Sequence, residues 1–304
     1  MKRLFKITLP LIELICLPFI IIGAFLLKFY RQKGSERLKL STKILKLIGV
    51  FPIIDNYYEP LFNDRMITNN LSLARKLPGI KFNLSKQLEL LKQLTYQNEF
   101  DAFVNEEKNK DSSISFKIKN GSFESGDAEF LYNFLRHTKP SKVIEIGCGS
   151  STKIIHKALN KNKKTDDRSS THICIEPFEH TWLETFPEIK LIRKKVENIE
   201  IEFFKNLEVG DLLFIDSSHI IRPQGDVLYE YLTIIPSLPK GINIHIHDIF
   251  SPHDYKEEWI KKRVLFWNEQ YLLEALLSKT NSFEVLASLN LLMKNNYNEL
   301  KKVC

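Results

Sequence analysis

The sequence predicts an α/β fold, in which a mainly parallel sheet carries helices on both of its faces. Three observations indicate this fold. Short apolar runs alternate with amphipathic segments from residue 121 onwards, several of the runs end in an acidic residue, and two glycines closely follow the first run. Strands that alternate with helices form parallel sheets, and such sheets bind ligands at the carboxyl ends of their strands.

Five strands are expected between residues 140 and 250. They are the apolar runs at residues 142–146, 172–176, 190–193, 211–216 and 242–248. Helices are expected at residues 126–137, 151–159 and 226–235, near Trp182 and through Phe203-Phe204. Ser125 is a residue type that caps helices, and Pro140 is expected to end the first of them. A further helix is expected to open at Phe266 and to continue through Leu277.

The chain of 304 residues exceeds the usual size of one domain, and its 43% hydrophobic and 27% charged residues are values of a globular protein. We expect three parts. Residues 1–40 form a hydrophobic membrane-associated segment, residues 41–120 a helical lead-in or cap, and residues 121–304 the α/β domain.

The N-terminal segment is apolar from residue 7 to residue 27, which is about the length that crosses a bilayer as a helix. Pro10, Pro18 and Glu13 interrupt this pattern. A signal peptide is an alternative, but no small-x-small cleavage site follows the run. An apolar helix that packs on the protein itself is another, and whether the segment spans the bilayer or lies on it stays open.

Basic residues flank this segment unequally. The net charge of the chain is +7, which suits an anionic surface, either a membrane or a nucleic acid. Three basic residues precede the segment, whereas seven follow it, namely Lys28, Arg31, Lys33, Arg37, Lys39, Lys43 and Lys46. The positive-inside rule therefore predicts a membrane-associated protein whose long C-terminal part is cytoplasmic. Four widely spaced cysteines without a CxxC pair agree with a reducing compartment.

The first strand leads into a glycine turn. Glu145 ends the strand region, Gly147 and Gly149 form the turn, and Ser151 opens a helix. Such a turn brings backbone N–H groups close to a ligand. A dinucleotide fingerprint has a third glycine where this chain has Thr152. A second acid, Glu176, ends the next strand.

Glu-x-Gly-x-Gly followed one strand later by an acid resembles the first motifs of class I S-adenosylmethionine-dependent methyltransferases, which have a Rossmann-like sheet. The resemblance implies that the turn passes under the methionine and ribose of S-adenosylmethionine and that Glu176 accepts the ribose hydroxyls. The cofactor-binding residues expected from it are Glu145, Gly147, Gly149, Ser151, Glu176 and Asp216.

A second cluster follows the later strands. The fourth strand ends in Asp216-Ser-Ser-His219, and the fifth ends in His247-Asp248. This pattern resembles the branch catalogued as methyltransferase family 24, which includes sugar O-methyltransferases. The resemblance implies that Asp216 and Asp248 hold a divalent metal such as Mg²⁺, that Asp216 takes part in catalysis, and that His219 is the general base. His247 stands where metal-dependent relatives carry an acid, which speaks against magnesium.

Other stretches extend the resemblance more loosely. The motifs DSSH, HIHDIF and FWNEQYLLEALL are similar to those of uncharacterised bacterial proteins. By the same resemblance, residues 283–289 should form a closing antiparallel strand. The loop at residues 251–255 is expected to cover the cofactor or the substrate. His245 and His247 lie on the same side of their strand, and one of them is expected to be structural.

The function expected is S-adenosylmethionine-dependent O-methylation of a small-molecule or sugar-type hydroxyl. Two alternatives stay open. A nucleic-acid methyltransferase would suit the basic charge, but much of that charge lies beside the apolar segment and no aromatic-basic stretch appears, so nucleic acid is not the expected partner. A membrane-bound protein that binds the cofactor without catalysis is the other. The identity of the acceptor and the oligomeric state are not predicted.

Overall fold

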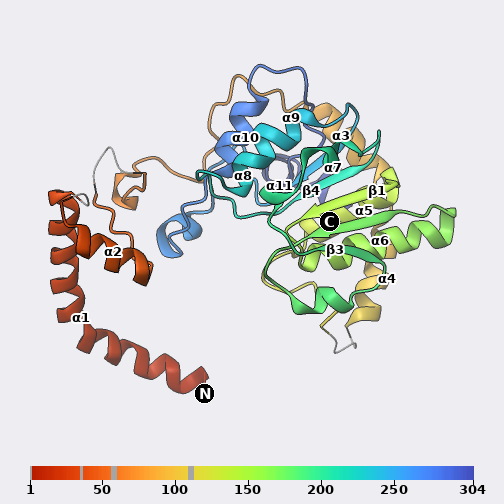
Figure 1. Ribbon diagram of the computed structural model, residues 1–304. Helices are drawn as coiled ribbons and strands as arrows, with labels where there is room; N and C mark the ends of the chain where they lie inside the picture. Colours follow the sequence, from red (N-terminus) through yellow and green to blue (C-terminus); the bar gives the residue numbers. More distant parts are fainter. Residues whose placement is uncertain (1, 35–36, 56–59, 109–112) are drawn as a thin grey trace. The chain divides into compact units, whose positions relative to one another are not determined.

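A computed structural model describes residues 2–34, 37–55, 60–108 and 113–304. The chain divides into two compact units, Met1–Asn70 and Leu71–Cys304 (Figure 1). Each unit is considered by itself below.

The first unit is helical. Helix α1 (Lys2–Lys33) is followed by α2 (Lys39–Ile48) and by a single turn, η1 (Asp64–Met66). Pro10 and Pro18 lie inside α1 without ending it. Within the described residues, Leu9–Lys33 is the one stretch of helix that is long and apolar enough to cross a membrane, by length and composition. A signal sequence would pass the same test, so the segment indicates membrane association only weakly.

The second unit is built on a five-stranded parallel sheet with the order β3-β2-β1-β4-β5. This confirms the predicted α/β fold. Each predicted strand forms within a few residues of its expected bounds: β1 (Lys142–Ile146), β2 (Thr171–Ile175), β3 (Ile189–Ile192), β4 (Leu212–Ile215) and β5 (Asn243–Ile246). The order reverses between β1 and β4, which is where open parallel sheets bind ligands.

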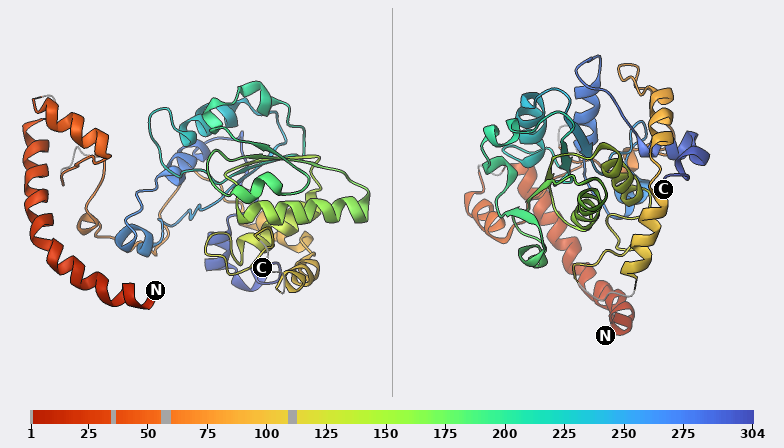
Figure 2. Two further views of the ribbon diagram at one scale, coloured as in Figure 1. Left: turned by 60° about the horizontal axis from the view of Figure 1, so that its bottom comes forward. Right: turned by 90° about the vertical axis from the view of Figure 1, so that its right-hand side faces the viewer.

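Helices cover both faces of the sheet, as Figure 2 shows for α6 and for the helices between β4 and β5. The helices and turns between the strands are α6 (Ser150–Asp166), η2 (Thr181–Thr185), η3 (Val196–Asn198), α7 (Ile201–Lys205), α8 (Asp226–Tyr229), the π-helical turn η4 (Glu230–Ile234) and α9 (Ile235–Ser237). The predicted helix at residues 226–235 is thus three consecutive pieces, and the helix near Trp182 is a 3₁₀ turn.

The remaining helices frame the sheet. Before it come α3 (Leu84–Gln93), α4 (Gln97–Glu107) and α5 (Asp127–Thr138), and after it come the π-helical turn η5 (Glu258–Lys262), α10 (Glu269–Leu277), α11 (Leu289–Asn295) and α12 (Tyr297–Leu300). The residue before α5 is Gly126; Ser125 instead donates a hydrogen bond from its hydroxyl to Glu129 in the first turn.

Side chains alternate between the two faces of the sheet, as strand geometry requires. Val143 of β1 and Phe214 of β4 pack in one core with α4, α5 and α6. Ile144 of β1 and Ile215 of β4 pack in a second core with α8 and η4. Glu145 therefore points to the same face as α6, which begins directly after the glycine turn.

The predicted closing strand at residues 283–289 is wrong. No strand forms there, and α11 begins at Leu289. The segment bonds to α3 instead: the backbone N–H of Ser288 donates to Gln87 Oε1 at 2.8 Å, and Lys86 pairs with Glu284 at 2.6 Å. The side chain of Gln87 thus satisfies the backbone N–H of Ser288, which a strand would have paired with the sheet edge.

Candidate functional site

The glycine turn approaches β4 too closely for any side chain. Gly147 has a φ of +77°, and a Cβ on it would lie 1.8 Å from the carbonyl oxygen of Asp216. The backbone N–H of Asp216 also donates to Ile146 O at 2.9 Å. Gly149 is less restricted, since its Cβ would first meet His180 Nε2 at 3.5 Å. The turn thus joins the carboxyl ends of β1 and β4 and then enters α6.

A cleft of about 720 Å³ opens over these strand ends. Gly147, Gly149 and Ser151 line it from the turn, Glu176 lines it from the end of β2, and Asp216 lines it from the end of β4. Its other walls are formed by residues 120, 122 and 123, by residues 177–180 and 195–197, and by residues 217, 218, 222 and 226. Five of the six residues expected to bind the cofactor therefore lie on one cleft.

Glu176 is held in place by backbone N–H groups. Its Oε1 accepts hydrogen bonds from the N–H groups of Phe178 and Glu179, each at 2.9 Å, and its Oε2 accepts one from Cys148 N at 3.3 Å. An ionised carboxylate offers about four acceptor positions. About one position, on Oε2, stays available to a ligand in the cleft.

Glu145, the sixth expected residue, does not line the cleft. It is fully buried beneath the turn. Its Oε1 accepts hydrogen bonds from the hydroxyls of Ser151 at 2.6 Å and Thr152 at 3.1 Å, and its Oε2 contacts His172 Nε2 at 2.9 Å and Cys174 Sγ at 3.5 Å. Its carboxylate therefore fastens the start of α6 to β2. This position corrects the expected contact with the cofactor to a positioning role, because the strand's alternation turns Glu145 away from the cleft.

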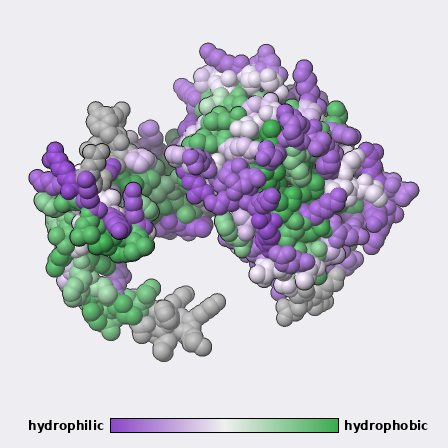
Figure 3. All heavy atoms as spheres, in the orientation of Figure 1, coloured by the Kyte–Doolittle hydropathy of each residue, from purple (hydrophilic) through white to green (hydrophobic). Residues whose placement is uncertain are grey.

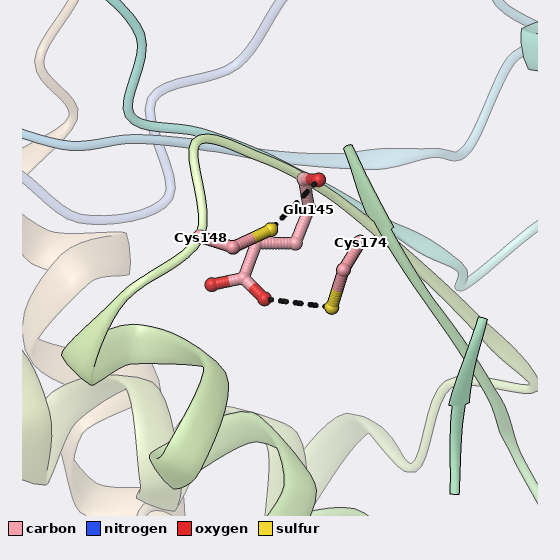
Figure 4. A group of neighbouring side chains, drawn as sticks. All are labelled: Glu145, Cys148 and Cys174. Carbon is pink, nitrogen blue, oxygen red and sulfur yellow. Dashed lines mark hydrogen bonds between the residues drawn. The ribbon is translucent and has the colours of Figure 1, made fainter. Parts of the chain in front are cut away.

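Two cysteines lie beside Glu145 (Figure 4). Burial raises the pKa of the Cys148 thiol, whereas the hydrogen bond with Cys148 lowers the pKa of Cys174. Glu145 and the two thiols bring possible metal-ligating atoms within 4.8 Å of one another. The acceptor positions of Glu145 are already used by four donors of the protein, so this group is a buried polar network rather than a site with a vacant ligand.

Asp216 and Asp248 come together with two histidines at the ends of β4 and β5. Asp216 Oδ1 lies 3.2 Å from His219 Nε2 and 3.3 Å from His247 Nδ1. Asp248 Oδ2 lies 3.8 Å and 3.5 Å from the same nitrogens. His219 and Asp248 have left-handed φ values of 60° and 54°, which are uncommon for residues other than glycine, although Asp and His adopt them more often than most, and which concentrate at functional sites.

His245 packs elsewhere on the same face of β5. Its ring stacks on Phe214 at 4.7 Å, and burial lowers its pKa to about 4. His247 contacts Phe123 at 4.9 Å and faces the carboxylates. Of the two histidines, His245 is therefore the structural one, as expected for one of the pair.

Glu269, which the sequence analysis did not single out, holds His219 from behind. Its Oε2 lies 2.7 Å from His219 Nδ1, its Oε1 accepts a hydrogen bond from the Tyr231 hydroxyl at 2.9 Å, and it is fully buried. Trp267 packs its ring against His219 at 4.2 Å. The available signal was a charged residue among the aromatic and polar residues that open the FWNEQYLLEALL stretch.

These contacts decide the charge of His219. Burial opposes its protonation, but hydrogen bonds with Asp216 and Glu269 outweigh burial and raise its pKa to about 10. Burial opposes the charge of Asp216, but its hydrogen bonds with His219 and His247 outweigh burial and hold its pKa below its usual range. His219 is therefore an imidazolium at neutral pH in the free protein, whereas the general base that the resemblance implied must be a neutral imidazole.

The cluster fits magnesium poorly. Asp216, His219 and Asp248 bring possible ligand atoms within 4.8 Å of one another. However, Mg²⁺ prefers oxygen ligands in a regular octahedron, and here imidazole nitrogens of His219 and His247 occupy the space between the two carboxylates. The methyl-transfer step is therefore described below with the protein's own groups.

Comparison with known proteins agrees with this geometry. The model of a family described as a methyltransferase domain matches residues 144–249, which run from the middle of β1 to just beyond β5. An uncharacterized protein of Archaeoglobus fulgidus is 32% identical over 164 residues, which cover 50% of this chain and 72% of the relative. No solved structure matches the chain significantly. The chain belongs to this methyltransferase family, in its class I, family 24-like branch.

Proposed function

We propose that this protein transfers the methyl group of S-adenosylmethionine to a hydroxyl of a small-molecule or sugar-type acceptor. The observation that carries the proposal is the cleft at the switch point of the sheet. Its floor is the Gly147 turn, and Glu176 and Asp216 stand at the ends of the two strands that flank β1. A volume of about 720 Å³ is typical of a small-molecule site.

The cofactor would lie across the turn. The remaining acceptor position on Glu176 Oε2 suits a ribose hydroxyl, and Gly147 leaves the backbone bare for close approach. Ser151 lies at the start of α6 but its hydroxyl is bonded to Glu145, so it contributes backbone rather than side chain to the cleft. Glu145 positions the turn from below.

Methyl transfer forms a bond between the acceptor oxygen and the methyl carbon and breaks the bond between that carbon and sulfur. The hydroxyl proton must leave, and we assign it to His219, which Asp216 and Glu269 orient. His219 does not itself line the cleft but contacts Asp216, which does, and its imidazolium must first release its own proton to solvent before it can accept this one. The cofactor's sulfonium is a cation, and a cation near Asp216 disfavours the imidazolium. Cofactor binding would thereby bring His219 closer to the neutral form that accepts a proton.

Calorimetric titration of the full chain with S-adenosylmethionine and with NAD tests the cofactor assignment. We expect saturable binding of the former alone; tight binding of NAD, or no binding of S-adenosylmethionine, would overturn the assignment. His219→Ala should abolish methyl transfer to hydroxylated acceptors while the cofactor still binds, and His137→Ala, at the end of α5, is the control.

Two alternative functions predict different experimental results. A non-catalytic cofactor-binding protein would leave parent and His219→Ala equally inert on a broad panel of hydroxylated acceptors. A nucleic-acid methyltransferase would show salt-sensitive retention on RNA in a chain that lacks residues 1–40. Neither is favoured by a specific contact in the cleft.

For the parts of the chain we propose the roles that the sequence predicts. Residues 1–40 associate with a membrane, residues 41–120 lead into the catalytic domain, and residues 121–304 carry the reaction. The basic residues after the apolar segment favour a cytoplasmic catalytic domain. Alkaline carbonate extraction of membranes from cells that express the full chain tests the anchor.

A further inference from the structure

Helix α2 has two chemically distinct faces. At about 100° per residue, Lys39, Lys43 and Lys46 fall together on one side. The opposite, wider side carries apolar residues, namely Leu40, Ile44, Leu45, Leu47 and Ile48. No residue of α2 is buried, and Leu40 and Leu47 are 73% and 87% exposed. Figure 3 shows hydrophobic side chains over much of this part of the chain.

Such a helix is stable only when another surface buries its apolar face. Helices of this length are marginal in water by themselves, and most of their stability comes from burying an apolar face. Gly49 ends α2 in a left-handed conformation. The exposed apolar residues Val50 and Phe51 follow it and extend the apolar surface beyond the helix.

A contact with α1 fixes the position of α2 along the length of α1. The hydroxyls of Tyr30 and Thr42 are 2.6 Å apart, and both helices belong to the same compact unit. Tyr30 lies three residues after Leu27, the end of the apolar run, which is about 4.5 Å along a helix. Tyrosine at such a position is typical of the membrane–water interface. The contact therefore places α2 beside the point where α1 changes from apolar to basic.

We propose that α2 lies in the plane of an anionic lipid leaflet, with its apolar face among the acyl chains and its three lysines toward the headgroups. This proposal rests on the proposed association of α1 with a membrane. Charge complementarity selects the occupant: amphipathic helices with a lysine face bind anionic bilayers, and the contact between Tyr30 and Thr42 places α2 beside the basic end of the apolar run in α1.

Fluorescent labels on opposite faces of α2 test the proposal in the full chain. One variant carries Leu47→Cys and the matched control carries Lys46→Cys, both with the exposed Cys16 changed to Ser. Each is labelled with an environment-sensitive fluorophore and reconstituted in nanodiscs of phosphatidylcholine with or without phosphatidylglycerol. Brominated acyl chains should quench the label at residue 47 at least about threefold more than the label at residue 46, and more strongly with the anionic lipid.

The outcomes separate this proposal from the proposed anchor. Equal quenching at the two positions, or quenching that does not depend on phosphatidylglycerol, overturns the in-plane orientation even if α1 resists carbonate extraction. A blue-shifted label at residue 47 that lipids do not quench, and that depends on protein concentration, would show that a second copy covers the face instead. Changing Lys39, Lys43 and Lys46 together to Glu should abolish the lipid dependence, whereas Lys164→Glu, on an exposed part of α6, should leave it unchanged.

Discussion

At Gly147 a single added carbon would meet the carbonyl oxygen of Asp216 at 1.8 Å, in a backbone region with φ of +77°. Gly147→Ala should therefore destabilise the fold by more than about 1 kcal/mol and abolish cofactor binding. Gly149→Ala is the matched control, because its Cβ would approach nothing closer than 3.5 Å. Urea unfolding and calorimetry measure both effects. Similar losses in the two variants would contradict the geometric explanation.

Glu176 is the cleft's best-defined acceptor. Glu176→Gln keeps the size of the side chain but removes the charge that accepts backbone N–H groups and a ligand hydroxyl. A hydrogen bond to a charged group contributes about 1.5–3 kcal/mol, so the dissociation constant of S-adenosylmethionine should rise about tenfold to a hundredfold. Glu179→Gln, an exposed neighbour on the same cleft, should change it little. An unchanged affinity in Glu176→Gln would remove Glu176 from the cofactor site.

The carboxylates at the ends of β4 and β5 give a prediction about metal removal. Because His219 and His247 already sit between Asp216 and Asp248, a chelator should leave kcat/KM within about twofold. Activity measured after exhaustive dialysis against a chelator, with and without added magnesium, checks this. Loss of activity that magnesium alone restores would show that the ion displaces the histidines.

At the scale of elements, a buried charge couples β1, β2 and α6. Burial opposes the charge of His172, but Cys174 and Glu145 outweigh it and raise its pKa to about 10. A raised pKa stabilises the fold fully below the unfolded value of about 6.5, and the stabilisation is lost as the pH rises through about 10. The free energy of unfolding should therefore fall across this window more steeply in the parent than in His172→Gln.

The comparison between variants is needed because lysines and tyrosines also titrate near pH 10. His180→Gln, at a half-exposed histidine beside the cleft, is the control and should keep the parent's slope. Parallel unfolding profiles for the parent and His172→Gln would mean that His172 is neutral in the folded protein. Denaturant unfolding at several pH values between 6 and 11 measures the slopes.

The elements differ in how well their local sequence predicts them. Strand β1 forms at its predicted bounds because its apolar residues are buried on both faces and are bounded by Pro140 and by the glycine turn. The segment from residue 283 has similar apolar residues, yet its polar groups bond to α3, about 200 residues earlier in the chain. A contact between segments so far apart in the sequence cannot be predicted from a local sequence pattern.

The same limit applies to the site. Asp216 and Asp248 could be predicted because each follows a strand, and parallel strands bring their ends together. The role of Glu269 could not, since its partner His219 lies 50 residues away and Glu274 of the same helix is another buried acid that bonds elsewhere. Glu145 was assigned to the cleft from its place in the motif, although strand alternation directs it to the opposite side. Motif spacing therefore predicted which strand ends lie close together, whereas tertiary contacts decide what each side chain contacts there.

At the scale of the whole molecule, the proposed anchor and the proposed catalytic site belong to different compact units. Every described residue that lines the cleft lies between Asn120 and Asp226, and the buried clusters of the sheet begin at Leu91, so the second unit holds its own core. A chain that begins at Leu71 should bind S-adenosylmethionine with a dissociation constant within about twofold of the parent. It should also no longer sediment with membranes after carbonate treatment. Calorimetry and fractionation check the two expectations separately, and loss of cofactor binding in a folded truncated chain would mean that residues 1–70 complete the cleft.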